Sequence, residues 1–290
     1  MATEPIAPWL AVFDVQARQA CLTLPPGALR EWFNEAAQSR GLRTGLGASL
    51  HMIDQSELPV GCAYETHIAQ TGGLPTRDNL HDRFNALVWL HLPKLKALLN
   101  AIQAQEISLH GHRNNQRGPW RDWATLLDES GVLVLARQDE QVLQDCWRNH
   151  DWLGLFWDHR SRWLRPDGLM TPSAQLENGP VWSIWPVGHA LLEKGQRPYK
   201  AITAQAWVLA SPADALGSAA DSHALDLDGL HGWGQLDDWV SQALRLKQKA
   251  EAEGPSRLWP LPIMGVPGWC ADNQEQTFYQ DPRVFRPARI

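Results

Sequence analysis

The sequence has few cysteines, which excludes the small cysteine-rich classes of protein. Only four occur among 290 residues, and no two of them form a Cys-x-x-Cys pair. No histidines stand near them at zinc-finger spacing, and four cysteines in so long a chain do not make a disulfide scaffold. We therefore expect free thiols, which are typical of the reducing cytoplasm.

Long apolar segments are also lacking. The uncharged runs Asn178–Leu192 and Leu258–Ala271 are shorter than the roughly 20 residues of a membrane-spanning helix, and both contain prolines. The segment Met1–Leu10 carries no Lys or Arg, and Pro5 and Pro8 interrupt its apolar residues. A secretory signal has a basic start and an unbroken apolar stretch, so none is predicted. These absences favour a soluble, cytoplasmic protein with no membrane partner.

Positive charge is outnumbered by negative charge. Lys and Arg total 26 and Asp and Glu total 32, which gives a net charge of −6. Nucleic-acid-binding proteins usually carry a basic surface, so nucleic acid is not expected as a partner. Six aspartates lie between residues 211 and 238, where there is no Lys or Arg. We expect a solvated surface loop there. A small molecule or a protein remains open as the partner.

Several motifs that carry well-known chemistry are missing. There is no Gly-x-x-x-x-Gly-Lys-Ser/Thr phosphate loop, no His-Glu-x-x-His zinc motif and no Gly-x-Ser-x-Gly nucleophile elbow. Gly45 and Gly47 lack the third glycine of a dinucleotide-binding loop. The sequence therefore gives no support for the nucleotide-binding, zinc-protease and serine-hydrolase classes that these motifs define.

The composition is typical of a folded globular chain. Apolar residues make up 44% and charged residues 20%. The patterns predict a single α+β domain over residues 1–290, mainly helical, with a small antiparallel β-sheet. We expect strands at Cys62–Ala69 and Ala201–Leu209, and a hairpin of Trp123–Leu127 and Val132–Ala136 around an Asp-Glu-Ser-Gly turn. The 16 tryptophans are expected mostly in the core.

The strongest helical pattern follows Thr76. Apolar residues recur at helical spacing from Leu80 to His91, so one face of this helix is expected to be buried. Either Thr76 or Asp78 is the expected cap. Pro93 then interrupts the run, because proline lacks the N–H group that a helix interior requires.

An ordered set of short segments extends over most of the chain. It consists of Thr76-Arg-Asp-Asn-Leu-His-Asp-Arg-Phe, Arg117-Gly-Pro-Trp-Arg-Asp, Gly188-His-Ala-Leu-Leu-Glu-Lys, Pro260-Leu-Pro-Ile-Met-Gly-Val-Pro-Gly-Trp and Phe278-Tyr-Gln-Asp-Pro-Arg-Val-Phe-Arg-Pro. From about Leu58 to Pro287, this set resembles the bacterial family catalogued as domain of unknown function 3025. The resemblance implies a bacterial protein with one family-sized domain. It implies no activity and assigns no catalytic residue.

Polar residues of the helix after Thr76 form the first candidate site. Asp78, His81 and Asn85 stand at i, i+3 and i+7, in one row beside the buried face, and Asp82 adjoins His81. Imidazole and carboxylate groups ligate metals and transfer protons. We therefore take His81 and Asp82 as candidate catalytic residues and metal ligands. The alternative is a capping aspartate whose polar neighbours bond to nearby loops.

A second pair of ligand-type residues, His189 and Glu193, lies in the other half of the chain. Their spacing of four residues directs both to one side of a helix, which is the geometry of half a metal site. A complete site needs further ligands, and a catalytic one also keeps an open position. His81 with Asp82, or an acid of the Asp128-Glu129 turn, would supply them. The alternative is an ordinary surface pair.

Another order of the same residue types resembles that of metal-dependent phosphohydrolases of the HD type, which is a His, then His-Asp, then Asp. The corresponding residues here are His51 or His67, His81-Asp82, and Asp122 or Asp145. The HD-type fold is all helical, whereas this sequence also predicts strands. This interpretation is therefore the less favoured one.

A third candidate site lies in the polar segment His110–Arg121. Arg113, Arg117 and Arg121 lie there beside tryptophans, and such a set suits a phosphate, a carboxylate or a nucleotide base. The alternative is an internal set of Arg–carboxylate pairs in which arginine stacks on tryptophan.

Two functions remain open at this point. The first is a metal-dependent hydrolase in which His81, Asp82, His189 and Glu193 hold a divalent ion that activates water. The second is a non-catalytic protein that binds an anionic small molecule or a partner segment through the arginines of the Arg113–Arg121 loop. Bound metal separates the two, since only the first requires a stoichiometric ion.

Overall fold

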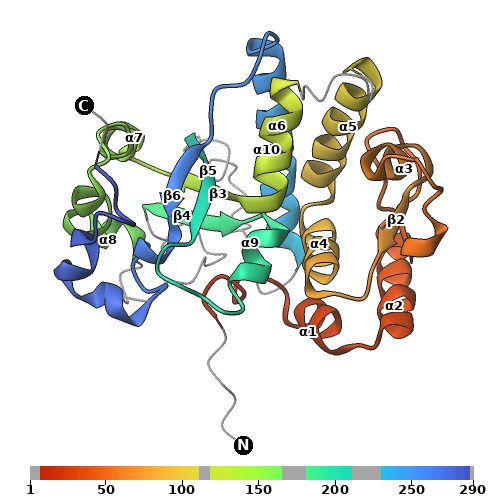
Figure 1. Ribbon diagram of the computed structural model, residues 1–290, viewed down its shortest axis with the longest axis horizontal. Coiled ribbons are helices and arrows are strands. Elements are labelled where there is room, and N and C mark those ends of the chain that lie inside the picture. Colours follow the sequence, from red (N-terminus) through yellow and green to blue (C-terminus); the bar gives the residue numbers. More distant parts are fainter. Residues whose placement is uncertain (1–6, 111–117, 165–180, 211–229, 288–290) are drawn as a thin grey trace, which may run out of the picture.

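The computed structural model describes residues 7–110, 118–164, 181–210 and 230–287 (Figure 1). Helices predominate, and they surround two small β-sheets. The mainly helical α+β class predicted from the sequence is therefore confirmed. Within these residues, no helix is both long and apolar enough to cross a membrane.

The larger sheet lies in the C-terminal half of the chain. In spatial order, its strands are β4 (Trp182–Pro186), β3 (Gly131–Ala136), β5 (Thr203–Ala210) and β6 (Trp259–Pro262). The β4–β3 and β5–β6 pairs are antiparallel, as the sequence led us to expect, whereas β3 and β5 are parallel. The strand expected near residue 201 is β5.

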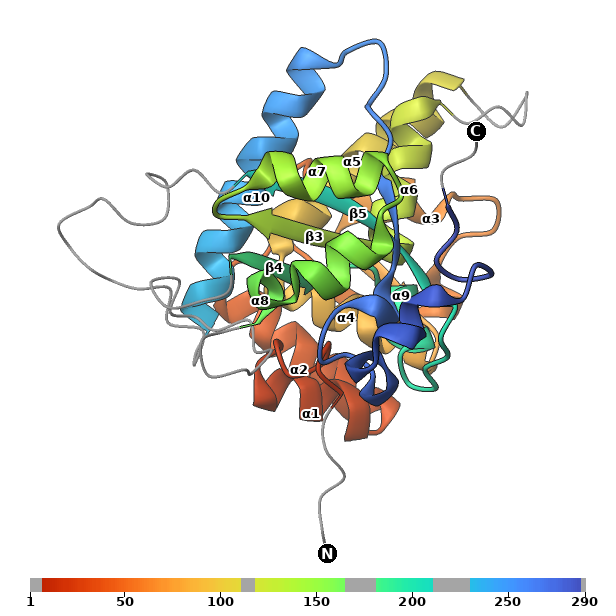
Figure 2. The same ribbon diagram turned by 90° about the vertical axis from the view of Figure 1, so that its left-hand side faces the viewer.

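Helices cover both faces of this sheet (Figures 1 and 2). They are α6 (Pro119–Ser130), α7 (Glu140–Arg148), the π-helical turn Gly154–Asp158, α8 (Arg160–Trp163) and α10 (Leu230–Ala250). Trp182 and Trp185 of β4 are three positions apart and so point to opposite faces. The Trp182 ring packs 5.5 Å from Trp163 of α8, and the Trp185 ring packs 5.2 Å from Trp233 of α10. Tryptophans thus fill the core on both sides of the sheet.

The N-terminal half is helical around the smaller sheet. Its elements are α1 (Val15–Thr23), α2 (Pro26–Ser39), β1 (His51–Asp54), the short helix Gln55–Glu57, α3 (Tyr64–Thr71), β2 (Gly73–Thr76), α4 (Leu80–His91) and α5 (Pro93–His110). Strands β1 and β2 pair in parallel. Short helices at Ile263–Gly265, Ala271–Gln274 and Gln276–Gln280 follow β6 near the C-terminus. The buried apolar side chains of both halves form one cluster.

Helix α4 lies in the middle of the molecule. It begins after Asn79, whose side chain accepts a hydrogen bond from the Asp82 N–H, so Asn79 is the cap in place of the predicted Thr76 or Asp78. All residues from Asp82 to His91 are buried, because other helices pack against α4 on several sides. Pro93 separates α4 from α5 as predicted, and it starts α5, where its missing N–H costs nothing.

Two strand predictions were wrong. Residues 62–69 contain the first part of helix α3, which ends at Gly72 in the left-handed conformation, with φ of 75°. The expected hairpin is the helix α6 followed directly by β3. Trp120, Trp123, Ala124 and Leu127 are buried at the i, i+3, i+4, i+7 spacing of one helix face. The Asp-Glu-Ser segment is the last turn of that helix, and Gly131 is the first residue of the strand.

Part of the predicted acidic surface loop is buried. Asp237 lies in α10 with 1% of its surface exposed. Its carboxylate accepts hydrogen bonds from the backbone N–H groups of Lys94 and Leu95, both 2.8 Å long, and so caps the start of α5. Residues 211–229 lie outside the described residues. The four cysteines are unpaired.

Candidate metal site and cavity

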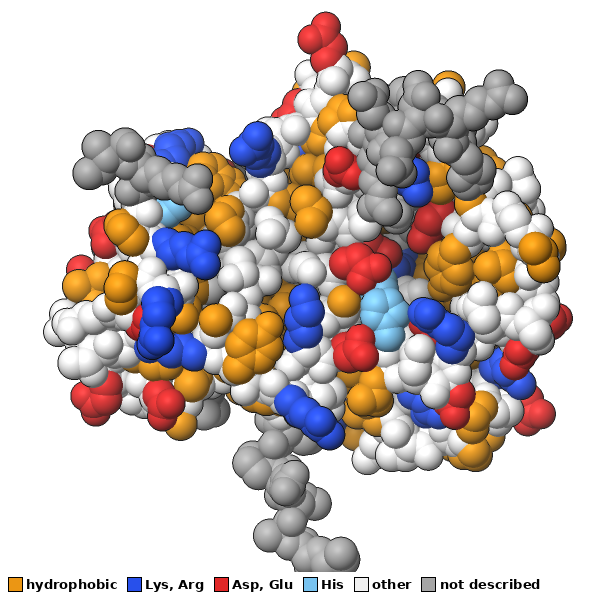
Figure 3. All heavy atoms as spheres, in the orientation of Figure 1, with side chains coloured by type: hydrophobic (Ala, Val, Ile, Leu, Met, Phe, Trp, Pro, Cys, Tyr) orange, Lys and Arg blue, Asp and Glu red, His pale blue; other side chains and the backbone are white. Residues whose placement is uncertain are grey.

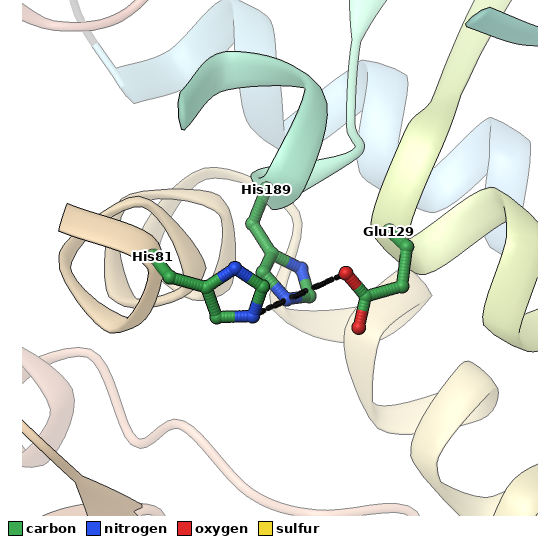
Figure 4. A group of neighbouring side chains, drawn as sticks. All are labelled: His81, Glu129 and His189. Carbon is green, nitrogen blue, oxygen red and sulfur yellow. Dashed lines mark hydrogen bonds and ion pairs between the residues drawn. The ribbon is translucent and has the colours of Figure 1, made fainter. Parts of the chain in front are cut away.

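Three ligand-type side chains from three helices point toward one another (Figure 4). His81 comes from the first turn of α4, Glu129 from the last turn of α6, and His189 from the start of α9 (His189–Lys194). The two Nε2 atoms are 3.0 Å apart, and Glu129 Oε2 lies 3.6 Å from His189 Nε2 and 4.0 Å from His81 Nε2. This group is called the His–Glu–His cluster below.

Two glycines place His189 beside Glu129. The backbone N–H groups of Val187 and Gly188 both donate to the Gly131 carbonyl oxygen, at 3.1 and 2.9 Å. A Cβ atom on Gly188 would lie 2.4 Å from Gly131 N and 2.7 Å from Glu129 O, which is too close for any side chain. The start of α9 therefore packs directly against the junction of α6 and β3. Because of this contact, His189 and Glu129 are neighbours.

Glu193 orients the imidazole of His81. Its Oε2 lies 3.1 Å from His81 Nδ1, on the side of the ring away from the cluster. Since an ionised carboxylate only accepts hydrogen bonds, the Nδ1 atom carries the hydrogen. The second ring nitrogen of a metal-binding histidine usually donates a hydrogen bond from its N–H group to a carboxylate in this way. Glu193 therefore contacts the cluster through its hydrogen bond with His81 and is not itself one of the three converging side chains.

His189 is buried and electrically neutral near pH 7. Its side chain is 5% exposed, and burial lowers the pKa of its imidazole to about 3. A neutral imidazole is the form that binds metal ions. Its Nδ1 lies 3.9 Å from Asp128 Oδ2, so a carboxylate stands behind this ring as well.

The carboxylate of Asp128 is paired with the buried ammonium group of Lys96 on α5. Burial alone would raise the pKa of Asp128, but the charge of Lys96 is the largest of the effects that hold this pKa below its usual value. Burial and the charge of Asp128 raise the pKa of Glu129. Negative charge is thus concentrated around the cluster, which favours the binding of a cation.

Asp82 is engaged elsewhere. Its carboxylate accepts hydrogen bonds from the backbone N–H of Arg77 at 2.6 Å and from the Arg77 guanidinium at 3.1 Å. The side chain is nearly fully buried. Of the four metal ligands predicted from the sequence, His81 and His189 lie in the His–Glu–His cluster, Glu193 bonds to His81, and Asp82 pairs with Arg77.

The cluster opens into a polar cavity of about 170 Å³. Its other polar lining residues are Tyr64, Glu65, Arg77, Asp82, Asn85, Lys96, Asn100 and Asp128. Burial raises the pKa of the Glu65 carboxyl group to about 7. On the molecular surface, an imidazole is visible where α4 and α9 meet, with acidic side chains above and below it (Figure 3). The cluster is therefore accessible from solvent on one side and from the cavity on the other.

The structure describes only one of the three arginines predicted as an anion-binding site. Arg113 and Arg117 fall outside the described residues, and Arg121 is in the first turn of α6, where a loop was expected. The HD-type order is not assembled, because Asp82 is held by Arg77 and exposed Asp145 bonds to Arg148. The single group of metal-ligand type found among the described residues is the His–Glu–His cluster.

Lys96 and Asn100 of the cavity were missed by the sequence analysis. They stand four residues apart on α5, so they share a face. A similar row of His81 and Asn85 was recognised on α4. Helices α4 and α5 are otherwise apolar, and each carries one such row of polar residues. Together the two rows would have indicated a polar cavity between the helices.

The profile of the family described as "Protein of unknown function (DUF3025)" matches residues 50–289. The chain therefore belongs to this family, which confirms the resemblance carried by the ordered set of short segments in the sequence. The search of curated proteins and the search of solved structures each returned no match.

Proposed function

We propose that this protein is a metal-dependent hydrolase that holds one divalent ion between His81 Nε2, His189 Nε2 and the carboxylate of Glu129. The spacing of these three atoms carries the proposal. Ligands about 2.0–2.1 Å from a tetrahedral ion lie about 3.3 Å from one another. The observed separations of 3.0, 3.6 and 4.0 Å bracket that value.

The surroundings support a catalytic rather than a structural ion. Three protein ligands leave a fourth position for water, and that arrangement is typical of catalytic zinc sites. A divalent ion held by His81, Glu129 and His189 would supply activation of water near neutral pH. The adjoining cavity provides space for a substrate.

Within the cavity, Glu65 is suited to proton transfer. Its pKa of about 7, raised by burial, lets it both accept and release a proton near neutral pH. Asn100 donates a 2.6 Å hydrogen bond to Glu65 Oε2 and fixes this carboxyl group against α5. We assign Glu65 the role of general base or acid in the same hydrolysis.

Elemental analysis tests the proposal. The full-length protein is purified without chelators and without a histidine tag, and Zn, Mn and Fe are measured per chain. We expect about one ion for the wild type, and a loss of most of it in His81→Ala and in His189→Ala. The control His51→Ala removes an exposed histidine on β1 and should keep the metal.

The variant Asp82→Asn distinguishes the His–Glu–His cluster from the ligand set predicted from the sequence, which included Asp82. Because Asp82 binds Arg77, this variant should retain stoichiometric metal. Circular dichroism of each variant shows whether it is folded. A wild type without metal after reconstitution, or folded His81→Ala and His189→Ala variants with full metal content, would contradict the proposal.

A further inference from the structure

Two amide side chains line the cavity, Asn85 from α4 and Asn100 from α5. Asn100 Nδ2 donates to the backbone oxygen of Glu65 at 2.9 Å and to its carboxylate at 2.6 Å. Because both partners are acceptors, the orientation of this amide is fixed. Its Oδ1 atom is therefore an acceptor, and it is buried without a partner among the described residues.

Asn85 on α4 offers a second buried group of this kind. Its Nδ2 atom lies 3.2 Å from the Tyr64 hydroxyl, and its Oδ1 has no partner in the described part of the chain. A buried polar atom without a hydrogen bond is unfavourable, because it has lost its contact with water and gained no partner. The two amides, together with Glu65, therefore favour a ligand that brings hydrogen-bond donors into the cavity.

The cations of the cavity are already paired. Lys96 binds Asp128, and Arg77 binds Asp82 through both its backbone and its side chain. Among the described lining residues, no other Lys or Arg faces the cavity. Phosphate and carboxylate groups are usually bound by arginine or lysine. A strongly anionic substrate would thus find no unpaired Lys or Arg among the described lining residues, and it would lie next to acidic groups.

We infer that the substrate class of this site is a small uncharged compound with N–H donors next to a carbonyl carbon, namely a primary carboxamide or a urea. This inference rests on the proposed hydrolase function and specifies its substrate. A carbonyl carbon is an electrophile that water can attack, and the N–H groups match the acceptor oxygens of Asn100, Asn85 and Glu65. The cavity volume of about 170 Å³ admits only a small molecule or the reacting end of a larger one.

For a primary amide, the reaction balances with water alone. The water oxygen forms a bond to the carbonyl carbon, and the C–N bond breaks. The proton released by the water passes to the leaving nitrogen, so that ammonia and a carboxylic acid are formed. Glu65, which lines the cavity beside Asn100, is placed to carry this proton.

The test compares primary amides, which carry N–H donors, with their N,N-dimethyl forms, which carry none. Full-length protein with a measured metal content is assayed for ammonia release from acetamide, propionamide, benzamide and urea. Amine release from the N,N-dimethyl forms of the three amides, and phosphate release from p-nitrophenyl phosphate, are measured in parallel. A site built to bind N–H groups rejects analogues without them, so we expect kcat/KM for at least one primary amide to exceed that of its dimethyl form by on the order of 100-fold or more.

Asn100→Leu provides the matched test in the protein. It removes the buried acceptor and should reduce the preference for the primary amide by about tenfold or more, with metal content unchanged. Asn149→Leu, at the exposed end of α7, is the control and should retain the wild-type preference.

The outcomes separate this inference from the proposed function. Metal-loaded protein that releases ammonia from none of the probes, or that hydrolyses the phosphate ester in preference, overturns the amide assignment and leaves the metal site intact. Protein that binds no metal overturns the proposed function itself. Equal activity on primary and dimethyl amides also overturns the assignment, and this comparison needs no variant to fold.

Discussion

Glu193 Oε2 lies 3.1 Å from His81 Nδ1, while Nε2 of the same ring lies 3.0 Å from His189 Nε2. One nitrogen of His81 is thus held by a carboxylate and the other faces the cluster. The ring cannot rotate about its Cβ–Cγ bond without breaking the contact with Glu193. This arrangement gives Glu193 a positioning role that can be separated from that of a ligand.

Glu193→Gln should weaken the metal site without removing it. Loss of an outer partner of a ligating histidine typically reduces metal affinity 10- to 100-fold. We expect one ion per chain at saturating metal, with a higher dissociation constant measured by competition with a chelator. Glu253→Gln, at an exposed position after α10, is the control. A Glu193→Gln protein that binds no metal at any concentration would make Glu193 a direct ligand.

Gly188→Ala should damage both the fold and the site. The new Cβ would meet Gly131 N at 2.4 Å and so force apart the start of α9 and the α6–β3 junction. Overpacking of this kind typically costs about 1–3 kcal/mol of unfolding free energy. We expect a lower midpoint of urea unfolding and a weaker metal site.

Gly234→Ala is the matched control for that change. A Cβ there meets nothing within 4 Å, and the position is exposed within α10. Replacing glycine by alanine in a helix interior should raise stability by about 0.5–1 kcal/mol. If Gly188→Ala is as stable as Gly234→Ala, the close contact does not position α9.

Lys96→Met should strongly destabilise the protein. It removes the partner of Asp128 and leaves a buried carboxylate uncompensated, which typically costs about 3–5 kcal/mol. The double variant Lys96→Met with Asp128→Asn removes both charges and should recover part of this loss. Urea unfolding of the two variants measures the difference. A loss of under about 1 kcal/mol in Lys96→Met would show that the pair contributes no more than an exposed one.

His91 gives a prediction for pH. In its neutral form, Nδ1 donates to Leu87 O at 2.8 Å and Nε2 accepts from the Asp14 N–H at 3.0 Å. Burial lowers the pKa of this imidazole from 6.5 to about 4. The unfolded chain therefore binds a proton between pH 6.5 and 4 that the folded chain does not. The stability contributed by neutral His91 is present above pH 6.5 and is lost as the pH falls toward 4.

The loss through His91 amounts to about 3 kcal/mol, at 1.36 kcal/mol per pKa unit. Since His91→Gln has no such proton to bind, the difference in unfolding free energy between wild type and variant should shrink by that amount between pH 7 and pH 4. Measuring the difference removes the opposite contributions of Glu65 and Asp237, whose pKa values are raised by burial. A difference that stays constant with pH would contradict the assignment.

The sequence predicted those features that depend on local patterns. The periodic residues of α4 and the proline that ends it were recognised because both signals depend only on residues close together in the sequence. The helix on which His189 and Glu193 were expected was likewise recognised. The same local rules misassigned α6, because the Asp-Glu-Ser-Gly segment fits either a turn or a helix end. The helical spacing of Trp120, Trp123 and Leu127 was the signal against a strand.

The candidate site could be predicted only as residue types. Spacing placed His189 and Glu193 on one face of a helix, but could not say that His189 meets Nε2 of His81 and Glu193 meets its Nδ1. Asp82 stands beside His81 in the sequence, yet successive residues of a helix point about 100° apart, and Asp82 bonds to Arg77. The pairing of Lys96 with Asp128 depends on how α5 packs on α6, which no short-range pattern encodes.

The three members of the His–Glu–His cluster come from distant parts of the chain. Forty-eight positions separate His81 from Glu129, and sixty separate Glu129 from His189. An ion held by all three would act as a cross-link that closes two long loops, and it would bind only after α4, α6 and α9 have come together. Occupancy of the site would then report on completed folding, and metal at a hundredfold excess over its Kd would add about 2.7 kcal/mol to the unfolding free energy.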